Sequence, residues 1–266
     1  MVEVDDWTCE YGGLVMGAPD SPISIVAVDG LLSLPEIRTS DLTLVQRHGL
    51  WAGDDYMGGR AITLTLEIYG STPEEFSTAL TAVQAAFWPG EKEKVLRFRF
   101  PGAASGQTAY VRARPRKRSA PLDLNFANLV CNVVVELFAT DPVIYGDVNP
   151  SLTLTAPKGD ATSRSLRLVQ HGAKTALPVI NVADAVNPVV ENLTTGTSFG
   201  VKASGSLAID VASRRVTAWS GADLTGAVVA GSTWPELPPG GYLMRLRRDD
   251  TAKEAVAHLR WEEHWI

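Results

Sequence analysis

The sequence is poor in cysteine, the residue that most often signals a structural metal or redox site. It has two cysteines among 266 residues, Cys9 and Cys131, and their separation fits no metal-ligand spacing. We expect two free thiols, buried or partly buried, as a reducing cytoplasm would leave them.

Histidine is equally scarce, and its distribution argues against a metal site or a catalytic histidine. His258 and His264 flank Glu262 and Glu263, but their spacing matches no zinc pattern, and a solvated C-terminal strand explains the cluster better. The sequence therefore predicts no metal and no cofactor. The four histidines are His48, His171, His258 and His264.

Catalytic motifs are missing as well. The chain has no phosphate-binding P-loop, no dinucleotide glycine fingerprint after a strand, and no Gly-x-Ser-x-Gly elbow. Carboxylates that are adjacent in sequence, such as Asp54-Asp55 and Asp249-Asp250, would point to opposite faces of a strand, which suits solvation better than acid–base work. We expect no catalytic residues and no enzyme, and the same absence argues against a cell-wall hydrolase.

Long apolar runs are absent too. No uninterrupted run approaches the ~20 residues that span a bilayer. Residues 1–6 are acidic, whereas a signal peptide needs positive charge followed by an apolar core. We expect a chain that is made in the cytoplasm and does not insert into a membrane.

The composition is that of a folded chain with two dissimilar halves. Hydrophobic residues make up 45% and charged residues 20%, enough for a proper core, and the net charge of -6 gives no sign of bulk nucleic-acid binding. Residues 1–148 carry 12 basic and 19 acidic side chains, and the remainder carries 12 and 11. We expect two domains, residues 1–148 and 149–266.

Strand patterns dominate the first half. Residues 61–69 alternate with period two, placing Ile62, Leu64, Leu66 and Ile68 on one face. One amphipathic helix is predicted, beginning at Ser71-Thr72-Pro73 and stopping at Pro89-Gly90, with its apolar stripe at Phe76, Leu80, Val83, Ala86 and Phe87. Further strands are predicted at 23–28, 42–45, 95–100, 108–113 and 129–138, and a linker at 145–150.

Residues 46–60 are predicted to form a long hairpin loop. Four glycines make its tip flexible, and its large side chains have no obvious local core. The candidates for a subunit or partner contact are Leu50, Trp51, Tyr56 and Met57. The alternative is burial of these side chains against the same chain.

A dense basic run follows at 112–118. Three interpretations stay open: a solvated loop between Tyr110-Val111 and Pro121-Leu122, a contact with acidic surface on a neighbouring subunit, or a nucleic-acid contact. No aromatic residues interleave the run, which disfavours stacking on single strands. Its charged members are Arg112, Arg114, Arg116, Lys117 and Arg118.

The second half is predicted to be an antiparallel β-sandwich. Short strands are expected at 152–155, 179–182, 189–193, 206–211, 215–219 and 242–247, separated by turn residues and without a helix. Trp219 and Trp234 are candidates for stacking on a sugar ring, although buried tryptophans in a core are commoner.

Several stretches together resemble a known family. Gly53 through Gly58-Gly59-Arg60 into residues 62–70 resembles the N-terminal domain of distal tail proteins from long non-contractile-tailed phages, a siphovirus tail component. The helix end at 85–89 and the strand at 96–98 fit the same pattern. The second half is similar to the galectin-like sandwich found in many members, through residues 187–188, 192–196, 207–211, 214–217 and 234–240. The resemblance spans residues ~20 to 266, without the basic run.

The resemblance implies a split-barrel or β-sandwich N-terminal domain with one helix and a long hairpin, followed by a galectin-like sandwich. It further implies a virion protein at the tail tip. Six copies would form a baseplate hub ring, closing β-sheets between neighbours, which joins the tail tube to the tip complex. Partners would be other copies, the tail tube protein, the hub or tail-associated protein and the tape measure protein. DNA would pass through the lumen without specific binding, which an acidic wall favours.

Two alternatives from the sequence remain. One is a carbohydrate-binding, host-adhesion module of the tail tip, in which Trp219 or Trp234 stacks on a cell-wall sugar. The other is a tail tube subunit or another minor tail protein. A tube subunit stacks into long polymers, for which a second sandwich domain is less natural.

Overall fold

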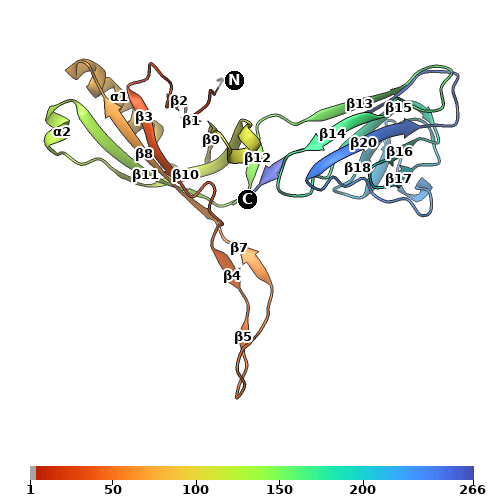
Figure 1. Ribbon diagram of the computed structural model, residues 1–266, viewed down its shortest axis with the longest axis horizontal. Coiled ribbons are helices and arrows are strands. Elements are labelled where there is room, and N and C mark those ends of the chain that lie inside the picture. The colour runs from red at the N-terminus through yellow and green to blue at the C-terminus, as the bar shows by residue number, and fades with distance from the viewer. Residues whose placement is uncertain (1–3) are drawn as a thin grey trace. The chain divides into compact units, whose positions relative to one another are not determined.

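The computed structural model describes residues 4–266, and these form two compact units (Figure 1). Unit 1 takes in the described residues up to Asp147 together with Ile266, and unit 2 runs from Val148 to Trp265. Strands account for 47% and helices for 10%, so the mainly-β fold class is confirmed. The galectin-like character of the second half stays a prediction.

Unit 1 is built around one curved antiparallel sheet in the order β2-β1-β9-β10-β11-β8-β3, with β12 added to β10. Strands β2 and β3 are therefore its two edges. Its elements are β1 (Thr8–Tyr11), β2 (Leu14–Met16), β3 (Ile23–Asp29), β4 (Ile37–Thr39), β5 (Leu42–Thr43), β6 (Leu50–Trp51), β7 (Asp55–Met57), β8 (Arg60–Tyr69), α1 (Pro73–Ala86), β9 (Lys94–Arg99), the 3-10 helix η1 (Ala103–Gly106), β10 (Ala109–Ser119), α2 (Leu124–Ala127), β11 (Val130–Ala139) and β12 (Ile144–Gly146).

Strand β8 carries the core of unit 1. The period-two pattern places Ile62, Leu64, Leu66 and Ile68 on the inner face, and all four are 0% exposed, as the sequence predicts. β8 pairs along its whole length with β11 and on its other side with β3. It is therefore held on both sides.

Helix α1 begins and ends where its sequence predicts. The Thr72 hydroxyl accepts a hydrogen bond from Glu75 N at 3.2 Å, and the Glu75 carboxylate accepts one from Ser71 N at 2.8 Å. Two acids in the first turn face the positive end of the helix dipole. The buried face consists of Phe76, Ala79, Val83 and Ala86, while the predicted Leu80 is only half-buried.

The interpretation of residues 112–118 as a loop is wrong. The run lies inside β10, whose first part pairs with β9 and whose second part pairs with β11. A register shift between Pro115 and Lys117 lets proline, which has no N–H to donate, sit within the strand. The sequence did not identify this part of β10 as a strand because nearly every outward-facing residue is basic, which hides the period-two alternation of apolar and polar residues.

Other differences from the sequence prediction are local. The strand predicted at 42–45 shortens to β5, which pairs only with β6. Part of the predicted linker at 145–150 is strand β12, where Tyr145 pairs with Tyr110 and the two rings stack with centroids 5.5 Å apart. Strands β1 and β2 and the four-residue helix α2 are not predicted from the sequence, because they are too short to show a period.

Both cysteines are buried free thiols, as predicted. Burial raises the pKa of Cys9 to about 12, with a smaller contribution from the negative charge of Glu10, and burial likewise raises the pKa of Cys131. We expect neither thiol to react with a thiol-specific reagent at pH 8 until the chain unfolds, because both the thiolate and access are lacking. Counting labelled cysteines by mass spectrometry, with and without denaturant, checks this; rapid native labelling of Cys9 would contradict it.

Unit 2 is a sandwich of two antiparallel sheets, β13-β21-β15-β18-β19 and β14-β20-β16-β17. Alternate residues of both sheets face a shared core that includes Ile180, Phe199, Leu207 and Leu259. Its elements are β13 (Ser151–Ala156), β14 (Leu166–Gln170), β15 (Val179–Val186), β16 (Val189–Asn192), β17 (Thr197–Gly200), β18 (Ser204–Asp210), β19 (Arg215–Ala218), the 3-10 helix η2 (Thr225–Ala227), β20 (Gly240–Arg247), β21 (Ala255–Arg260) and β22 (His264–Trp265).

The C-terminal strand is not solvated on both faces, contrary to the sequence prediction. Only His264–Trp265 (β22) form a strand there, and Trp261, Glu263 and Trp265 are all buried, with Glu263 1% exposed. Its carboxylate accepts a hydrogen bond from the backbone N of His171 at 2.8 Å. The charged residues of this segment therefore hide, in the sequence, the fact that every second side chain is buried.

Candidate functional site

Residues 31–59 form a hairpin between β3 and β8 of unit 1 (Figure 1). β4 pairs with β7, and β5 pairs with β6 nearer the tip. In the described part of the chain these four strands pair only with one another. The hairpin is therefore an addition to the sheet of unit 1 and not a part of it.

Arg60 fixes the base of the hairpin. Its Nη1 donates to the carbonyl oxygens of Gly30, Leu31 and Ser33 at 2.6, 3.0 and 2.8 Å, and its Nε donates to Pro142 O at 2.8 Å. The residue is 1% exposed, and this burial lowers the pKa of the guanidinium from its ordinary value. A single cation thus ties the outgoing strand of the hairpin to the end of β11.

Gly30 makes the turn out of β3 possible. Its φ is +86°, and a Cβ built there would lie 2.0 Å from the carbonyl oxygen of Ala61. The Asp29 carboxylate accepts a hydrogen bond from Gly30 N at 2.8 Å, which fixes the turn. Only glycine fits this position.

Hydrogen bonds link the two arms of the hairpin between its base and its tip. The Asp41 carboxylate accepts from Gly53 N at 2.8 Å, and the Ser40 hydroxyl donates to Asp54 O at 3.0 Å. Nearer the base, Gly58 N donates to Glu36 O at 2.6 Å. Hydrogen bonds between the two arms of the hairpin therefore extend beyond the short paired strands.

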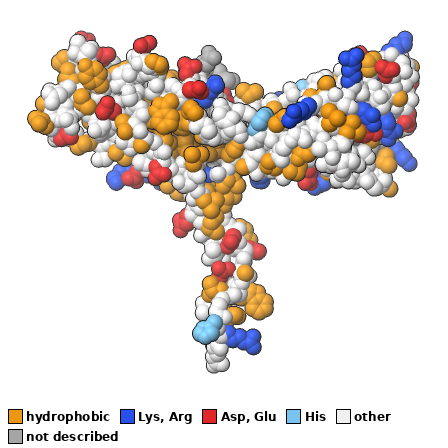
Figure 2. All heavy atoms as spheres, viewed as in Figure 1, with side chains coloured by type: hydrophobic (Ala, Val, Ile, Leu, Met, Phe, Trp, Pro, Cys, Tyr) orange, Lys and Arg blue, Asp and Glu red, His pale blue; other side chains and the backbone are white. Residues whose placement is uncertain are grey.

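The four large side chains proposed as a contact all lie exposed on the hairpin. Leu50, Trp51 and Tyr56 are 60%, 70% and 59% exposed, and Met57 is 37% exposed. Burial of these side chains against the same chain, the alternative left open by the sequence, is not what the structure has. Figure 2 shows hydrophobic side chains at the base of the hairpin and again towards its tip.

The sequence prediction of this surface was incomplete. Leu42 and Val45 are also exposed on the hairpin, and Leu32 and Leu34 are exposed at its base. Residues 42–45 were predicted only as a strand, and the exposure of Leu42 and Val45 shows that they belong to this surface. We call the eight residues the hairpin surface: Leu32, Leu34, Leu42, Val45, Leu50, Trp51, Tyr56 and Met57. Apolar side chains gathered in this way are typical of interaction sites.

The basic run is largely engaged within unit 1. Lys117 forms an ion pair with Glu136 at 2.9 Å, Arg118 donates to Gln84 O at 2.8 Å, and Arg114 donates to Glu91 O at 3.5 Å. Arg112 lies over the Tyr110 ring and Arg116 over the Phe138 ring, at 5.7 and 5.3 Å from the ring centres. These internal contacts weaken the idea of a dedicated nucleic-acid site, while the subunit contact stays a prediction.

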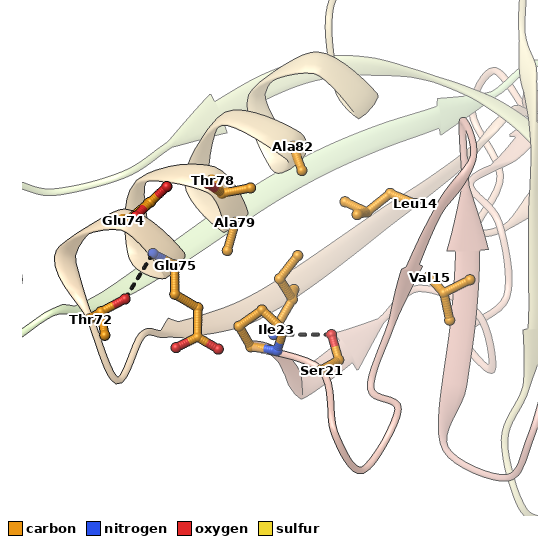
Figure 3. Close-up of a pocket in the computed structure, with 11 residues that line it drawn as sticks. Leu14, Val15, Ser21, Ile23, Thr72, Glu74, Glu75, Thr78, Ala79 and Ala82 are labelled. Atoms are coloured by element: carbon orange, nitrogen blue, oxygen red, sulfur yellow. Dashed lines mark hydrogen bonds between the residues drawn. The ribbon is translucent and has the colours of Figure 1, made fainter.

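A groove of about 500 Å³ lies beside α1, at the place where the two edges of the sheet come together (Figure 3). Leu14 and Val15 of β2, Ile23 of β3 and Ala79 and Ala82 of α1 supply apolar walls, and Glu74 and Glu75 lie at its rim. The Ser21 and Thr72 hydroxyls of the groove accept hydrogen bonds from Ile23 N and Glu75 N, and the Glu75 carboxylate accepts from Ser71, so these groups serve the local structure. Its chemistry suits packing better than catalysis.

The two tryptophans proposed to stack on a sugar lie in different environments. Trp219 is 66% exposed. Trp234 packs on the Phe199 ring with centroids 4.5 Å apart, and the Arg214 guanidinium lies 5.3 Å from its ring centre. Only Trp219 therefore presents a free face.

Metal-binding clusters and membrane-spanning helices were looked for in the described residues. Within residues 4–266, no group of three or more histidine, cysteine, aspartate or glutamate side chains is arranged to hold a metal ion. Over the same residues, no helix combines the length and apolarity that crossing a membrane requires.

Comparison with known proteins found likeness in structure but not in sequence. No protein-family model matches the chain, and no curated protein matches it. The crystal structure of the phage SPP1 Dit protein (gp 19.1), described as a paradigm of the hub adsorption apparatus in phages that infect Gram-positive bacteria, matches with a TM-score of 0.55 and 14% identity, covering 96% of this chain and 98% of that one. The phage P2 baseplate in its activated conformation with Ca matches with a TM-score of 0.43 and 10% identity, covering 94% and 93%. The resemblance to phage distal tail proteins is thus confirmed at the level of the fold, which this chain shares with SPP1 Dit.

Proposed function

We propose that the chain is a structural subunit of a phage tail tip, of the distal tail or baseplate hub kind, and not an enzyme. The fold shared with SPP1 Dit supports this proposal. The observation that carries it is the hairpin surface, because exposed leucine, tryptophan and tyrosine side chains on an anchored hairpin need another protein chain to cover them.

We infer further that copies of the chain close into a hexameric ring at the tail tip. A head-to-tail contact in which one surface meets a different one produces a ring when its rotation closes. The hairpin surface would be one half of that contact. The tail tube, tape measure and hub proteins would then contact the ring.

The charge of the first half suits a ring through which DNA moves. Residues 1–148 carry a net charge of -7, and a negative lumen repels the polyanion so that it slides without binding. This net charge already includes the five cations of the basic run, of which Lys117 is paired with the Glu136 carboxylate.

The experiment is the mass of the purified chain in solution, measured by light scattering after gel filtration. A monomer has a mass of 28.5 kDa, and we expect a species about six times heavier that dissociates on dilution. The double variant Leu50→Ser/Trp51→Ser is expected to weaken self-association by roughly thirtyfold or more, the equivalent of ~2 kcal/mol at an interface anchor. Both side chains are exposed in the monomer, so folding should be unaffected.

Trp219→Ser is the matched control, because Trp219 on unit 2 is as exposed as Trp51 (66% against 70%). Equal losses in the control and the double variant would point to general stickiness and contradict the role of the hairpin. A wild-type chain that stays monomeric at high concentration would contradict self-assembly. Electron microscopy distinguishes a ring-forming subunit from the nearest alternative, a tail tube subunit, because a tube subunit would give long stacks instead of closed rings.

The carbohydrate-binding alternative retains one supporting observation, the exposed ring of Trp219. If it holds, Trp219→Ser abolishes binding to a glycan array without changing the solution mass. Trp234 is unsuited to the same role because its ring is occupied by Phe199 and Arg214.

A further inference from the structure

Unit 2 contains a cavity of about 590 Å³ on its outer surface, at one end of the five-stranded sheet. This volume lies within the range of sites for small molecules. Leu177, Val179 and Trp261 supply its apolar walls, and Lys174, Asn181 and Arg260 supply polar groups. All of its lining residues belong to unit 2, whereas the hairpin surface belongs to unit 1.

The sheet register explains why these side chains converge. Val179 of β15 lies directly opposite Arg260 of β21, so their side chains share one face of the sheet. Asn181 is two residues along from Val179 and therefore points to the same side. Their neighbours Ile180 and Leu259 are 0% exposed, which identifies the other face as the core. Strand pairing therefore places Arg260 and Asn181 on one face, while Lys174 and Thr175 come from the segment between β14 and β15.

Among the described residues of unit 2, Arg260 belongs to the arginines that form no ion pair, together with Arg164, Arg167 and Arg248. Arg214, Arg245 and Arg247 form ion pairs with Glu236 or Glu191. Within residues 4–266, neither Arg260 nor the Lys174 ammonium has a carboxylate within ion-pair distance. These cations are therefore available to an anion from outside.

The lining keeps a net positive charge, because it holds two cations and one carboxylate. Glu262, the one carboxylate among the lining residues, lies 3.4 Å from Nε2 of His264. Two cations, the Asn181 amide and the hydroxyl of Thr175 then face a cavity with an apolar wall. Guanidinium and ammonium groups bind carboxylate or phosphate, and amide and hydroxyl groups bind ligand hydroxyls.

We propose that this cavity binds a small anionic ligand rich in hydroxyl groups, either a sugar acid or a polyol phosphate. The anion lies against Arg260 and Lys174, the hydroxyls meet Asn181 and Thr175, and the carbon skeleton packs on Leu177 and Val179, which are 44% and 40% exposed. The site does not depend on ring assembly, so its test is independent of the test of the proposed function.

The test is ligand-observed NMR on the full chain, with sodium glucuronate and sn-glycerol 3-phosphate as probes and glucose and glycerol as neutral counterparts. We expect at least one charged probe to bind about tenfold or more tightly than its neutral counterpart, and to bind less tightly as salt is raised. Binding of glucuronate alone identifies a sugar acid, and binding of glycerol phosphate alone identifies a polyol phosphate.

Arg260→Gln is expected to weaken binding of the charged probe by roughly tenfold, and Lys174→Gln is also expected to weaken it. Arg167→Gln is the matched control, since Arg167 is also exposed and lies on the other sheet, in β14. The proposal is overturned if neither charged probe binds, if neutral and charged probes bind alike, or if Arg167→Gln weakens binding as much as Arg260→Gln does.

Discussion

Replacing Arg60 with alanine is expected to lower the free energy of unfolding of unit 1 by about 3 kcal/mol. The substitution leaves the carbonyl oxygens of Gly30, Leu31, Ser33 and Pro142 without their shared donor in a place from which water is largely excluded. An unsatisfied buried acceptor costs roughly 1–3 kcal/mol, and water can replace some of these bonds but not all of them. Hydrogen exchange of the β8 amides, followed at increasing urea concentration, measures this loss in the free energy of unfolding.

Arg38→Ala serves as the control for Arg60→Ala. Arg38 lies on the same hairpin but is exposed, so its removal should change stability by roughly 0.5 kcal/mol or less. Arg60→Lys should fall between the two, because an ammonium keeps the charge but not the planar set of donors. Arg60→Ala and Arg38→Ala having the same effect would show that the base of the hairpin is held by something other than the guanidinium.

Phe199→Ala is expected to destabilise unit 2 by about 3–5 kcal/mol and leave unit 1 unchanged. The ring is 1% exposed in the sandwich core and packs on Trp234, so its removal leaves a cavity with little chance to collapse. Scanning calorimetry should show one transition shifting to lower temperature while the other stays in place. A multidomain chain of this kind is not expected to unfold in one step.

Trp219→Ala is the control for Phe199→Ala, because it removes a large ring that is 66% exposed and outside the core of unit 2. Its expected effect is within roughly 0.5 kcal/mol. If Phe199→Ala lowers protection of β8 and β11 as much as that of β16 and β20, the two units fold as one and their independence is disproved.

Much of unit 1 could be predicted from local patterns. The alternation at 61–69 identified the core strand because one face of β8 is fully buried, and the helix was identified by Thr72, Pro73 and the acids that follow. Strand β10 was missed beyond residue 113 because its outward residues are basic and a proline interrupts it. Pairing with two different strands, the feature that makes it a strand, is invisible in a single sequence.

The candidate sites were predictable to different degrees. The exposure of Trp51 and Tyr56 could be predicted, because large side chains in a glycine-rich loop lack a local core. The anchoring role of Arg60 could not, since a buried arginine and an exposed one look alike in sequence, and its acceptors come from residues 27 to 82 positions away. The cavity at Arg260 was missed for a similar reason, because Val179 and Arg260 meet only through sheet register.

The hairpin has a consequence for how the chain can vary. It is inserted between β3 and β8, and the bonds of Arg60 close its base before any of the short strands beyond it begin. The sheet therefore does not depend on what lies past that closure, and doubling the length of such a loop costs only ~0.6 kcal/mol. Insertions, deletions and new tips can accumulate there while the body of unit 1 stays folded, so the reach of the hairpin can adapt to a changing neighbour at almost no cost in stability.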